Sequence, residues 1–267
     1  MITFIIPVKS KRVSGSWEHF SKLFERTIKS VSNQTSENFR IIVVCHEKPE
    51  ISFEHPKVEY IHVDFEPPVL KPELAEKHDG MKEEDKSKKI MAGLDFIKKY
   101  EQDYVMVADA DDCISNRIAE YVDEHKSQDL PGWYFKKGYI YREGDKFISL
   151  NKEGFNLLCG TCIVIKPDLI QHIFKSKPHL LYVHQTIQLT ESEALRPLPL
   201  PGAIYSMGNG ENHFMSGTMM KNLATGKKFF SLSSFKGILR KLKKYRVKPL
   251  NRKIKNEFGI YEVKAAS

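Results

Sequence analysis

The chain has 267 residues, 41% of them hydrophobic, and a net charge of +8, which predicts a globular protein of one large domain, or one domain with a tail. No run approaches the roughly 20 apolar residues that a membrane-spanning helix needs, and the opening residues (MITFIIP) predict a strand rather than a signal peptide. Four cysteines in a chain of this length fit a reducing compartment, so we expect a cytoplasmic location.

The first 130 residues alternate between two patterns. Four apolar runs are typical of buried strands: 3–8, 39–45, 58–63 and 103–109. Three segments carry apolar residues at helical spacing and predict helices: 17–31, 85–100 and 116–125. Residues 64–83 show neither period and predict a long loop. Strands that alternate with helices form βαβ units, so we expect an α/β fold with a mostly parallel, Rossmann-like sheet.

After residue 131 the pattern becomes mixed. Four segments predict strands: 133–142, 146–150, 159–165 and 203–207. A short helix is expected over residues 168–174. The Cys-x-x-Cys run at 159–162 falls in one of these strands, whereas a redox pair would open a helix, so we interpret its cysteines as buried core residues.

The end of the chain predicts a separate basic tail. Residues 221–264 contain 14 Lys and Arg against two Glu, a net charge of +12, which leaves about −4 for the rest. Residues 234–245 combine helical apolar spacing with Lys and Arg on the other face, a pattern typical of helices that lie on anionic membranes. We expect segment 231–255 to place the protein at the inner face of the membrane; the alternative is a helix that packs on its own domain. No nucleic-acid recognition motif accompanies the charge, so nucleic acid is not an expected partner.

The strongest single feature is an apolar strand that ends in carboxylates. The run 103–109 leads directly into Asp109, Asp111 and Asp112. Open α/β sheets bind ligands at the carboxyl ends of their strands. Neighbouring carboxylates repel one another unless a cation shares them, which predicts a hard divalent metal, Mn²⁺ or Mg²⁺, with further ligands from a substrate phosphate. The alternative is a solvated turn in which Asp112 or Ser115 caps the next helix. We favour an enzyme that acts on a nucleotide-activated substrate.

Several pieces of the first 120 residues resemble the family 2 glycosyltransferases of the GT-A fold, in the family's order and close to its spacing. They are FIIPV at 4–8, TIKSVSNQT at 27–35, FRIIVV at 39–44, DKSKK at 85–89 and the carboxylates at 109–112. The resemblance implies a glycosyltransferase domain over 1–220, made of a nucleotide-sugar-binding half (1–130) and an acceptor-side half (131–220), followed by the basic tail (221–267).

The resemblance also implies an activity. A sugar would move from a nucleotide-diphospho-sugar donor to a hydroxyl of a glycan or lipid-linked acceptor, in the synthesis of cell-surface polysaccharide or glycolipid. The diphosphate would be bound through a divalent metal at Asp109 and Asp111. The expected donor contacts are Pro7, Val8, Glu47, Asp85, Lys86, Lys89, Asp109, Ala110 and Asp111.

The sequence departs from the family's pattern in two places. The acidic pair after the second strand is replaced by VCHE at 44–47, which makes Glu47 the nearest acid. The Glu-Asp pair that supplies the general base of inverting members is absent from the acceptor half, and Glu191, Glu193 and His184 are the candidates for that role.

A late glycine-flanked loop offers a further metal ligand. GT-A enzymes often complete the metal shell with a histidine from such a loop, and His213 follows the run GNGEN at 208–212. Imidazole suits Mn²⁺ better than Mg²⁺, so a ligand at His213 would favour manganese.

Two other functions remain open. A sugar nucleotidyltransferase would share the sheet, although residues 9–15 are a poor match to the Gly-rich, Arg-containing loop that such enzymes carry after the first strand. A non-catalytic GT-A-like protein that binds glycan or membrane would explain the missing Glu-Asp pair.

Overall fold

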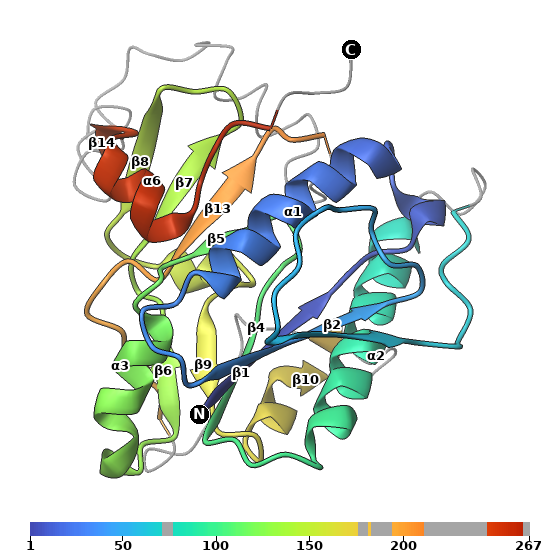
Figure 1. The fold of residues 1–267 in the computed structure, drawn as a ribbon, viewed down its shortest axis with the longest axis horizontal. Coiled ribbons are helices and arrows are strands. Elements are labelled where there is room, and N and C mark those ends of the chain that lie inside the picture. Colours follow the sequence, from blue (N-terminus) through green and yellow to red (C-terminus); the bar gives the residue numbers. More distant parts are fainter. Residues whose placement is uncertain (71–76, 176–180, 183–193, 211–244, 264–267) are drawn as a thin grey trace, which may run out of the picture.

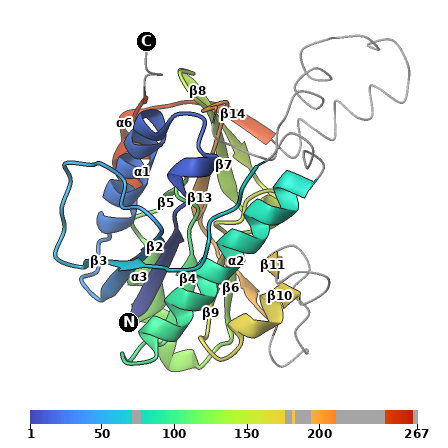
Figure 2. The same ribbon diagram turned by 90° about the vertical axis from the view of Figure 1, so that its right-hand side faces the viewer.

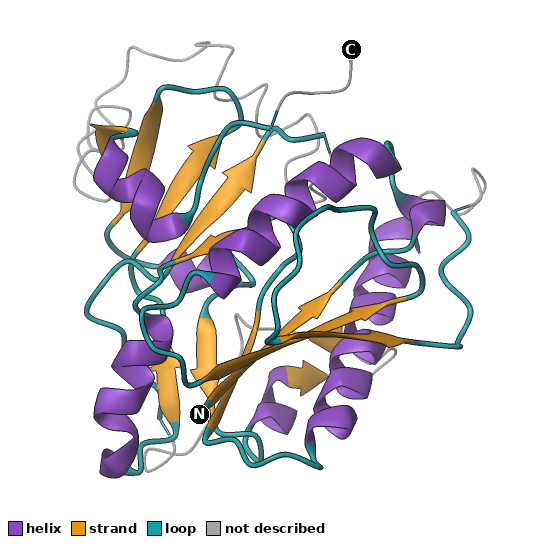
Figure 3. Cartoon of the chain, viewed as in Figure 1, coloured by secondary structure: helices purple, strands orange, loops and turns teal. Residues whose placement is uncertain are grey.

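The computed structural model describes residues 1–70, 77–175, 181–182, 194–210 and 245–263. These residues form a mixed α/β fold with two main sheets (Figures 1 and 3). The first half contains β1 (Ile2–Pro7), α1 (Trp17–Ser32), β2 (Phe39–Cys45), β3 (Val58–His62), α2 (His78–Ile97), β4 (Tyr104–Val107), β5 (Cys113–Ile114) and α3 (Ile118–His125). The second half contains β6 (Gly132–Tyr134), β7 (Gly138–Arg142), β8 (Phe147–Asn151), β9 (Ile163–Ile165), β10 (Phe174–Lys175), β11 (Leu181–Tyr182), β12 (Arg196–Pro197), β13 (Ala203–Met207), β14 (Tyr245–Pro249) and α6 (Arg252–Phe258). Short 3₁₀ turns lie at Lys11–Val13, Lys126–Gln128, Phe155–Leu157 and Ile170–Ile173.

The first sheet has seven strands in the order β12-β6-β9-β4-β1-β2-β3. Its β9 runs antiparallel to both neighbours, and the other pairings are parallel. The expected α/β class with a mostly parallel Rossmann-like sheet is therefore confirmed, and the arrangement is consistent with a GT-A-type fold. Its central strands β2, β1 and β4 end side by side, which brings the loops after them to one edge.

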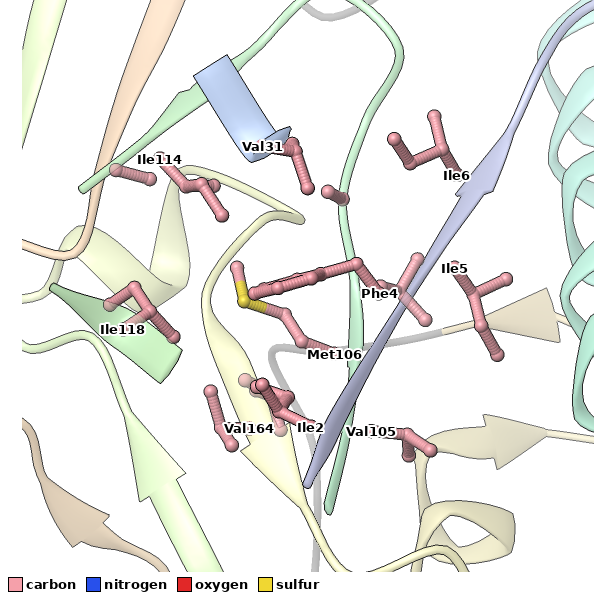
Figure 4. Close-up of a cluster of buried hydrophobic side chains, with 14 of the residues drawn as sticks. Ile2, Phe4, Ile5, Ile6, Val31, Val105, Met106, Ile114, Ile118 and Val164 are labelled. Carbon is pink, nitrogen blue, oxygen red and sulfur yellow. The ribbon is translucent and has the colours of Figure 1, made fainter. Parts of the chain in front are cut away.

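The central strands are apolar on both faces because helices cover both. Figure 4 shows Phe4 and Met106 on the side of Val31 from α1, and Ile5 and Val105 on the side of α2. Near-continuous apolar runs are typical of parallel strands buried in this way. The helix α2 lies so close that a Cβ at Gly93 would come within 2.8 Å of the Ile5 side chain, and Figure 2 shows it along that face.

The second sheet has five strands in the order β14-β8-β7-β13-β5. Figure 1 shows α6 beside this sheet. The sheet has its own apolar cluster, which includes Tyr139, Tyr141 and Ile148 of the sheet and Ile254 and Phe258 of α6. The described part of the basic segment packs on this sheet. Residues 245–249 form an edge strand paired with β8, and α6 buries its apolar face on the sheet. The high charge of the segment hid these buried apolar positions.

The fragment SVSNQT at 30–35 has a structural role at the end of α1. The Ser30 hydroxyl donates to Phe258 O at 2.7 Å and accepts from Ile114 N at 3.0 Å. Gln34 donates to Ser115 O and accepts from Ala119 N. Through these bonds α1 fixes β5 and the start of α3, the chain that directly follows the Asp109–Asp112 turn.

A buried ion pair joins α1 to the turn between β7 and β8. The Arg26 guanidinium is fully buried and lies 2.9 Å from Glu143 Oε2. The same guanidinium donates to Tyr261 O, and Glu143 accepts from Val263 N at 2.9 Å. Charges this deeply buried need bonded partners of opposite charge, and this pair with its contacts holds the second sheet against α1.

Three predicted elements differ from the structure in their extent. The segment 133–142 is not one strand: β6 belongs to the first sheet and β7 to the second, and the chain changes sheets before Gly138, where an added Cβ would lie 2.5 Å from the Phe155 ring. The helix α2 begins at His78, whereas the prediction began at residue 85. The first turns of the helix are polar and lack the apolar face on which the prediction relied. The strand β9 is limited to residues 163–165, and residues 159–162 form a turn.

No helix of the described ranges combines the length and apolar character that crossing a bilayer requires.

Candidate functional site

The loops after β1, β2 and β4 meet at the carboxyl edge of the first sheet. Val8 N donates to Val44 O at 2.8 Å, which continues the β1–β2 pairing beyond Pro7. Glu47 accepts from the Ser10 hydroxyl and from Lys11 N, both at 3.1 Å, and so ties the loop after β2 to the loop after β1. Parallel strands of an open sheet place ligand sites at this edge.

Asp109, directly after β4, forms an ion pair with α2. Lys86 Nζ lies 2.6 Å from Asp109 Oδ1, and both side chains are about one quarter exposed (23% and 26%). Burial alone would lower the pKa of Lys86, but the negative charges of Asp109 and Glu83 outweigh it, and the pKa is raised. Lys86 therefore carries a positive charge at this edge of the sheet.

Asp111 is bonded to a residue of the loop that follows β13. Asn209 Nδ2 donates to Asp111 Oδ2 at 2.9 Å, and His19 Nε2 of α1 donates to Asn209 O at 2.9 Å. Asn209 lies between Gly208 and Gly210, both with positive φ, so the chain turns sharply there after β13. Burial and then the charge of Asp109 raise the pKa of Asp111, while the Asn209 amide lowers it.

Asp112 is buried (1% exposed) and is saturated by hydrogen bonds. Its Oδ2 accepts from the Thr161 hydroxyl at 2.7 Å and from Cys159 Sγ at 3.2 Å, and its Oδ1 accepts from Ser206 N at 3.2 Å. Burial and the two neighbouring carboxylates raise the pKa of Asp112 well above its usual value. Asp112 therefore caps no helix, because its carboxylate accepts from Thr161, Cys159 and Ser206 instead.

The Cys-x-x-Cys turn forms a wall of the site. The Thr161 hydroxyl accepts from Asp109 N at 2.9 Å, and a Cβ at Gly160 would lie 2.9 Å from Asp109 Oδ2. Both flanking thiols are buried and reduced, and burial raises the pKa of each well above its usual value. The interpretation as buried cysteines agrees with this arrangement, although they lie in a turn and not in a strand.

Asp85 and Lys89 belong to a buried cluster near the loop after β2. The Asp85 carboxylate bridges His46 Nε2 at 2.9 Å and Lys89 Nζ at 2.6 Å. The Lys89 side chain is fully buried, and this burial lowers its pKa in spite of the opposing charge of Asp85. Of the two lysines among the expected donor contacts, the structure thus places Lys86 at the surface of the site and Lys89 inside the protein.

The donor atoms at this edge fit a divalent metal. Asp109 and Asp111 offer hard carboxylate oxygens close enough that one raises the pKa of the other, a repulsion that a shared cation removes. In the described part of the chain no three His, Cys, Asp or Glu side chains assemble into a metal cluster. A metal held by two carboxylates takes its remaining ligands from substrate phosphate or water, as magnesium sites commonly do.

The structure brings together some of the predicted site residues and leaves others outside its description. Pro7, Val8, Glu47, Lys86, Asp109, Ala110 and Asp111 lie along the same edge. Glu191, Glu193, His184 and His213 lie outside the described residues, as does most of the segment expected to form a basic helix.

Sequence reasoning missed three contributors to the site: Gly160, Thr161 and Asn209. The run GNG at 208–210 signals a turn after a strand, and that signal pointed to the correct loop. Nothing local to residues 160 and 161 indicates their contact with Asp109, which depends on the antiparallel insertion of β9 beside β4.

No protein-family model and no curated protein matches the sequence. Among solved structures, S. aureus TarS 1–349 in complex with UDP-GlcNAc aligns over 90% of this chain and 64% of that chain, with 12% identity and a TM-score of 0.42. Another structure of S. aureus TarS 1–349 aligns over 77% of this chain and 60% of that chain, with 11% identity and a TM-score of 0.38. The Francisella tularensis 2-C-methyl-D-erythritol 4-phosphate cytidylyltransferase aligns over 64% and 75%, with 13% identity and a TM-score of 0.35. The chain spans under two thirds of the TarS chains, and similarity this distant assigns it neither a family nor an activity.

Proposed function

We propose that the protein is a metal-dependent glycosyltransferase that uses a nucleotide-diphospho-sugar donor. The observation that carries the proposal is the group of Asp109, Asp111 and Lys86 at the carboxyl end of β4, beside the loops after β1 and β2. Two carboxylates suited to a divalent cation and a lysine suited to an anion form the charge pattern that a diphosphate with its metal requires.

Each part of the site has a separate task in this proposal. A bound metal would neutralise charge on the diphosphate leaving group. Lys86 would contact a phosphate oxygen, and the linked loops at Val8 and Glu47 would hold the nucleoside. Asn209 and Thr161 would keep Asp111 and Asp109 in place. The acceptor would be a glycan or a lipid-linked hydroxyl, and Glu191, Glu193 and His184 remain the proposed bases, with His213 a proposed metal ligand.

Thermal stabilisation by nucleotide sugars tests the donor. UDP-, GDP- and dTDP-sugars are added with and without Mn²⁺ to the wild type and to Asp111→Ala. A ligand at about 100 times its Kd adds roughly 2.7 kcal/mol of stability. We expect one nucleotide to raise the Tm in a metal-dependent way, and Asp111→Ala to abolish this effect. The matched control is Asp95→Ala, at an exposed carboxylate that pairs with Lys98 on α2.

Product analysis then separates the transferase from its alternatives. A transferase releases nucleoside diphosphate from the donor, by transfer or by slow hydrolysis. A nucleotidyltransferase consumes the donor with pyrophosphate and releases a nucleoside triphosphate. Binding without turnover, with or without Mn²⁺, would overturn the enzymatic proposal in favour of a glycan- or membrane-binding protein.

A further inference from the structure

The ion pair between Lys86 and Asp109 occupies the carboxylate that the proposed metal needs. Lys86 Nζ lies 2.6 Å from Asp109 Oδ1, at direct ion-pair distance. Gly160 packs against both partners of this ion pair: a Cβ there would come within 2.9 Å of Asp109 Oδ2 and 3.4 Å of Lys86 Nζ. An ammonium and a divalent cation cannot share this confined carboxylate without strong repulsion.

Of the two partners, the lysine is the one with room to move. Asp109 is fixed through its backbone, because its N–H donates to the Thr161 hydroxyl at 2.9 Å, and Thr161 is itself bonded to the buried Asp112. Lys86 ends a long flexible side chain that is 23% exposed, at an edge open to solvent. An ammonium on such a stem moves between anionic partners at little cost.

We infer that Lys86 and the divalent metal compete for Asp109, and that the Lys86 ammonium passes from Asp109 to the donor diphosphate when metal and donor bind together. This inference rests on the proposed function. In the empty protein Lys86 neutralises Asp109. With donor present, the phosphates give the ammonium a new partner and leave Asp109 to the metal. The exchange makes metal and nucleotide bind with positive coupling, since each removes an obstacle to the other.

The test uses Lys86→Met, which keeps an unbranched side chain of nearly the same length and removes its charge. Mn²⁺ affinity without nucleotide is measured by electron paramagnetic resonance, and UDP, GDP and dTDP affinities are measured by calorimetry at saturating Mn²⁺. We expect opposite signs: about tenfold tighter binding of Mn²⁺ alone, and about tenfold weaker binding of the nucleoside diphosphate that the wild type prefers. Damage to the fold would weaken both.

The matched control is Lys88→Met, two residues along α2. Lys88 pairs with Glu84 at 2.8 Å and is about half exposed, so its loss should change neither affinity. If Lys86→Met binds Mn²⁺ as tightly as the wild type or more weakly, Lys86 does not compete with the metal. If the wild type also loses Mn²⁺ binding in Asp111→Ala, the proposed function stands while the competition is overturned. A wild type that binds neither Mn²⁺ nor any of the nucleotides overturns both.

Discussion

The hydroxyl of Thr161 joins two parts of the site that are far apart in the sequence. It accepts from Asp109 N at 2.9 Å and donates to Asp112 Oδ2 at 2.7 Å, while both Thr161 and Asp112 are buried. A buried carboxylate that loses such a donor keeps its full desolvation cost without compensation. Asp112 thereby serves to position the turn that presents Asp109 and Asp111, and its carboxyl group is buried.

Replacing Thr161 with Val removes this hydroxyl at nearly constant volume. We expect the free energy of unfolding, measured with urea, to fall by about 1–3 kcal/mol, since a buried donor and a buried acceptor each lose their partner. Thr161→Ser, which keeps the hydroxyl, should lose much less. Equal stability of the Val and Ser variants would show that the bond to Asp112 contributes nothing.

The four cysteines should be unreactive in the folded protein. Burial raises the pKa of Cys45 and Cys113 to about 11 from an ordinary value of 9.0, and it raises the pKa values of Cys159 and Cys162 well above that ordinary value. Because the thiolate is the reactive form, we expect no reaction with Ellman's reagent at pH 8 until urea exposes the thiols. Rapid labelling, or a Cys159–Cys162 disulfide formed under mild oxidation, would contradict this.

The same pKa values predict a loss of stability at alkaline pH. Between about pH 9 and 11 the unfolded chain releases the thiol protons of Cys45 and Cys113 that the folded chain retains. The free energy of unfolding should therefore fall as the pH rises through this window. Denaturation curves at several pH values measure this change. The free energy of unfolding should fall less steeply with pH in the double variant Cys45→Ala, Cys113→Ala than in the wild type. Equal dependence on pH in the two proteins would argue against the raised pKa values.

Whole elements were predictable where the burial of a segment is uniform. The strand at 39–45 and the strand at 203–207 have the predicted bounds, and α1 ends one residue beyond its prediction, because their apolar residues follow a single period. The run 133–142 misled for a physical reason: Trp133, Tyr139 and Tyr141 continue one alternation across two sheets. A local pattern indicates which residues are buried, but it does not indicate which sheet they pack in.

The end of α6 depends on a glycine. Gly259 ends the helix at φ 61°, and a Cβ there would come 3.1 Å from Ser30 Cα. We expect Gly259→Ala to lower the free energy of unfolding by about 1–2 kcal/mol, the cost of a left-handed conformation for a residue with a Cβ. The matched control is Gly80→Ala in α2, where no atom lies within 4 Å and alanine favours the helix by up to about 1 kcal/mol. The same sign for both variants would contradict the interpretation.

At the scale of the whole molecule, the described end of the chain presents a basic surface. Arg246 of β14 and Arg252, Lys253 and Lys255 of α6 are exposed. The apolar face of α6, by contrast, is buried on the second sheet. Any attraction of this segment to an anionic membrane would therefore be electrostatic, without insertion of the helix.

Vesicle binding measures this attraction. We expect binding to phosphatidylglycerol vesicles at low salt and none to phosphatidylcholine vesicles. Each basic residue near the surface is worth about 1 kcal/mol, so Lys253→Gln with Lys255→Gln should weaken binding roughly 30-fold. Lys98→Gln with Lys99→Gln, at the far end of α2, is the control and should have little effect. Equal loss in both double variants would indicate a diffuse response to net charge.

The site itself was predictable in part. An apolar run followed by Asp109 and Asp111 locates the carboxyl end of a central strand from local information alone. The side chains that determine what each carboxylate does come from distant segments: Lys86 from α2, Thr161 beside β9 and Asn209 after β13. Three aspartates within four residues look equivalent in a sequence. Their neighbours in space distinguish them: Asp109 is paired with Lys86, Asp111 is bonded to Asn209, and Asp112 is buried.

The bond between Ser30 and Phe258 has a consequence for the order in which the chain folds during synthesis. Ser30 emerges from the ribosome early, yet its hydroxyl and the cluster around Ile254 and Phe258 find their partners only when residues 245–263 have been translated. Until then β8 is an uncovered edge and the Arg26–Glu143 pair lacks its contacts to residues 261–263. Nascent chains stalled before residue 245 should therefore hold a nearly finished first sheet beside an incomplete second one, and be the species that chaperones bind.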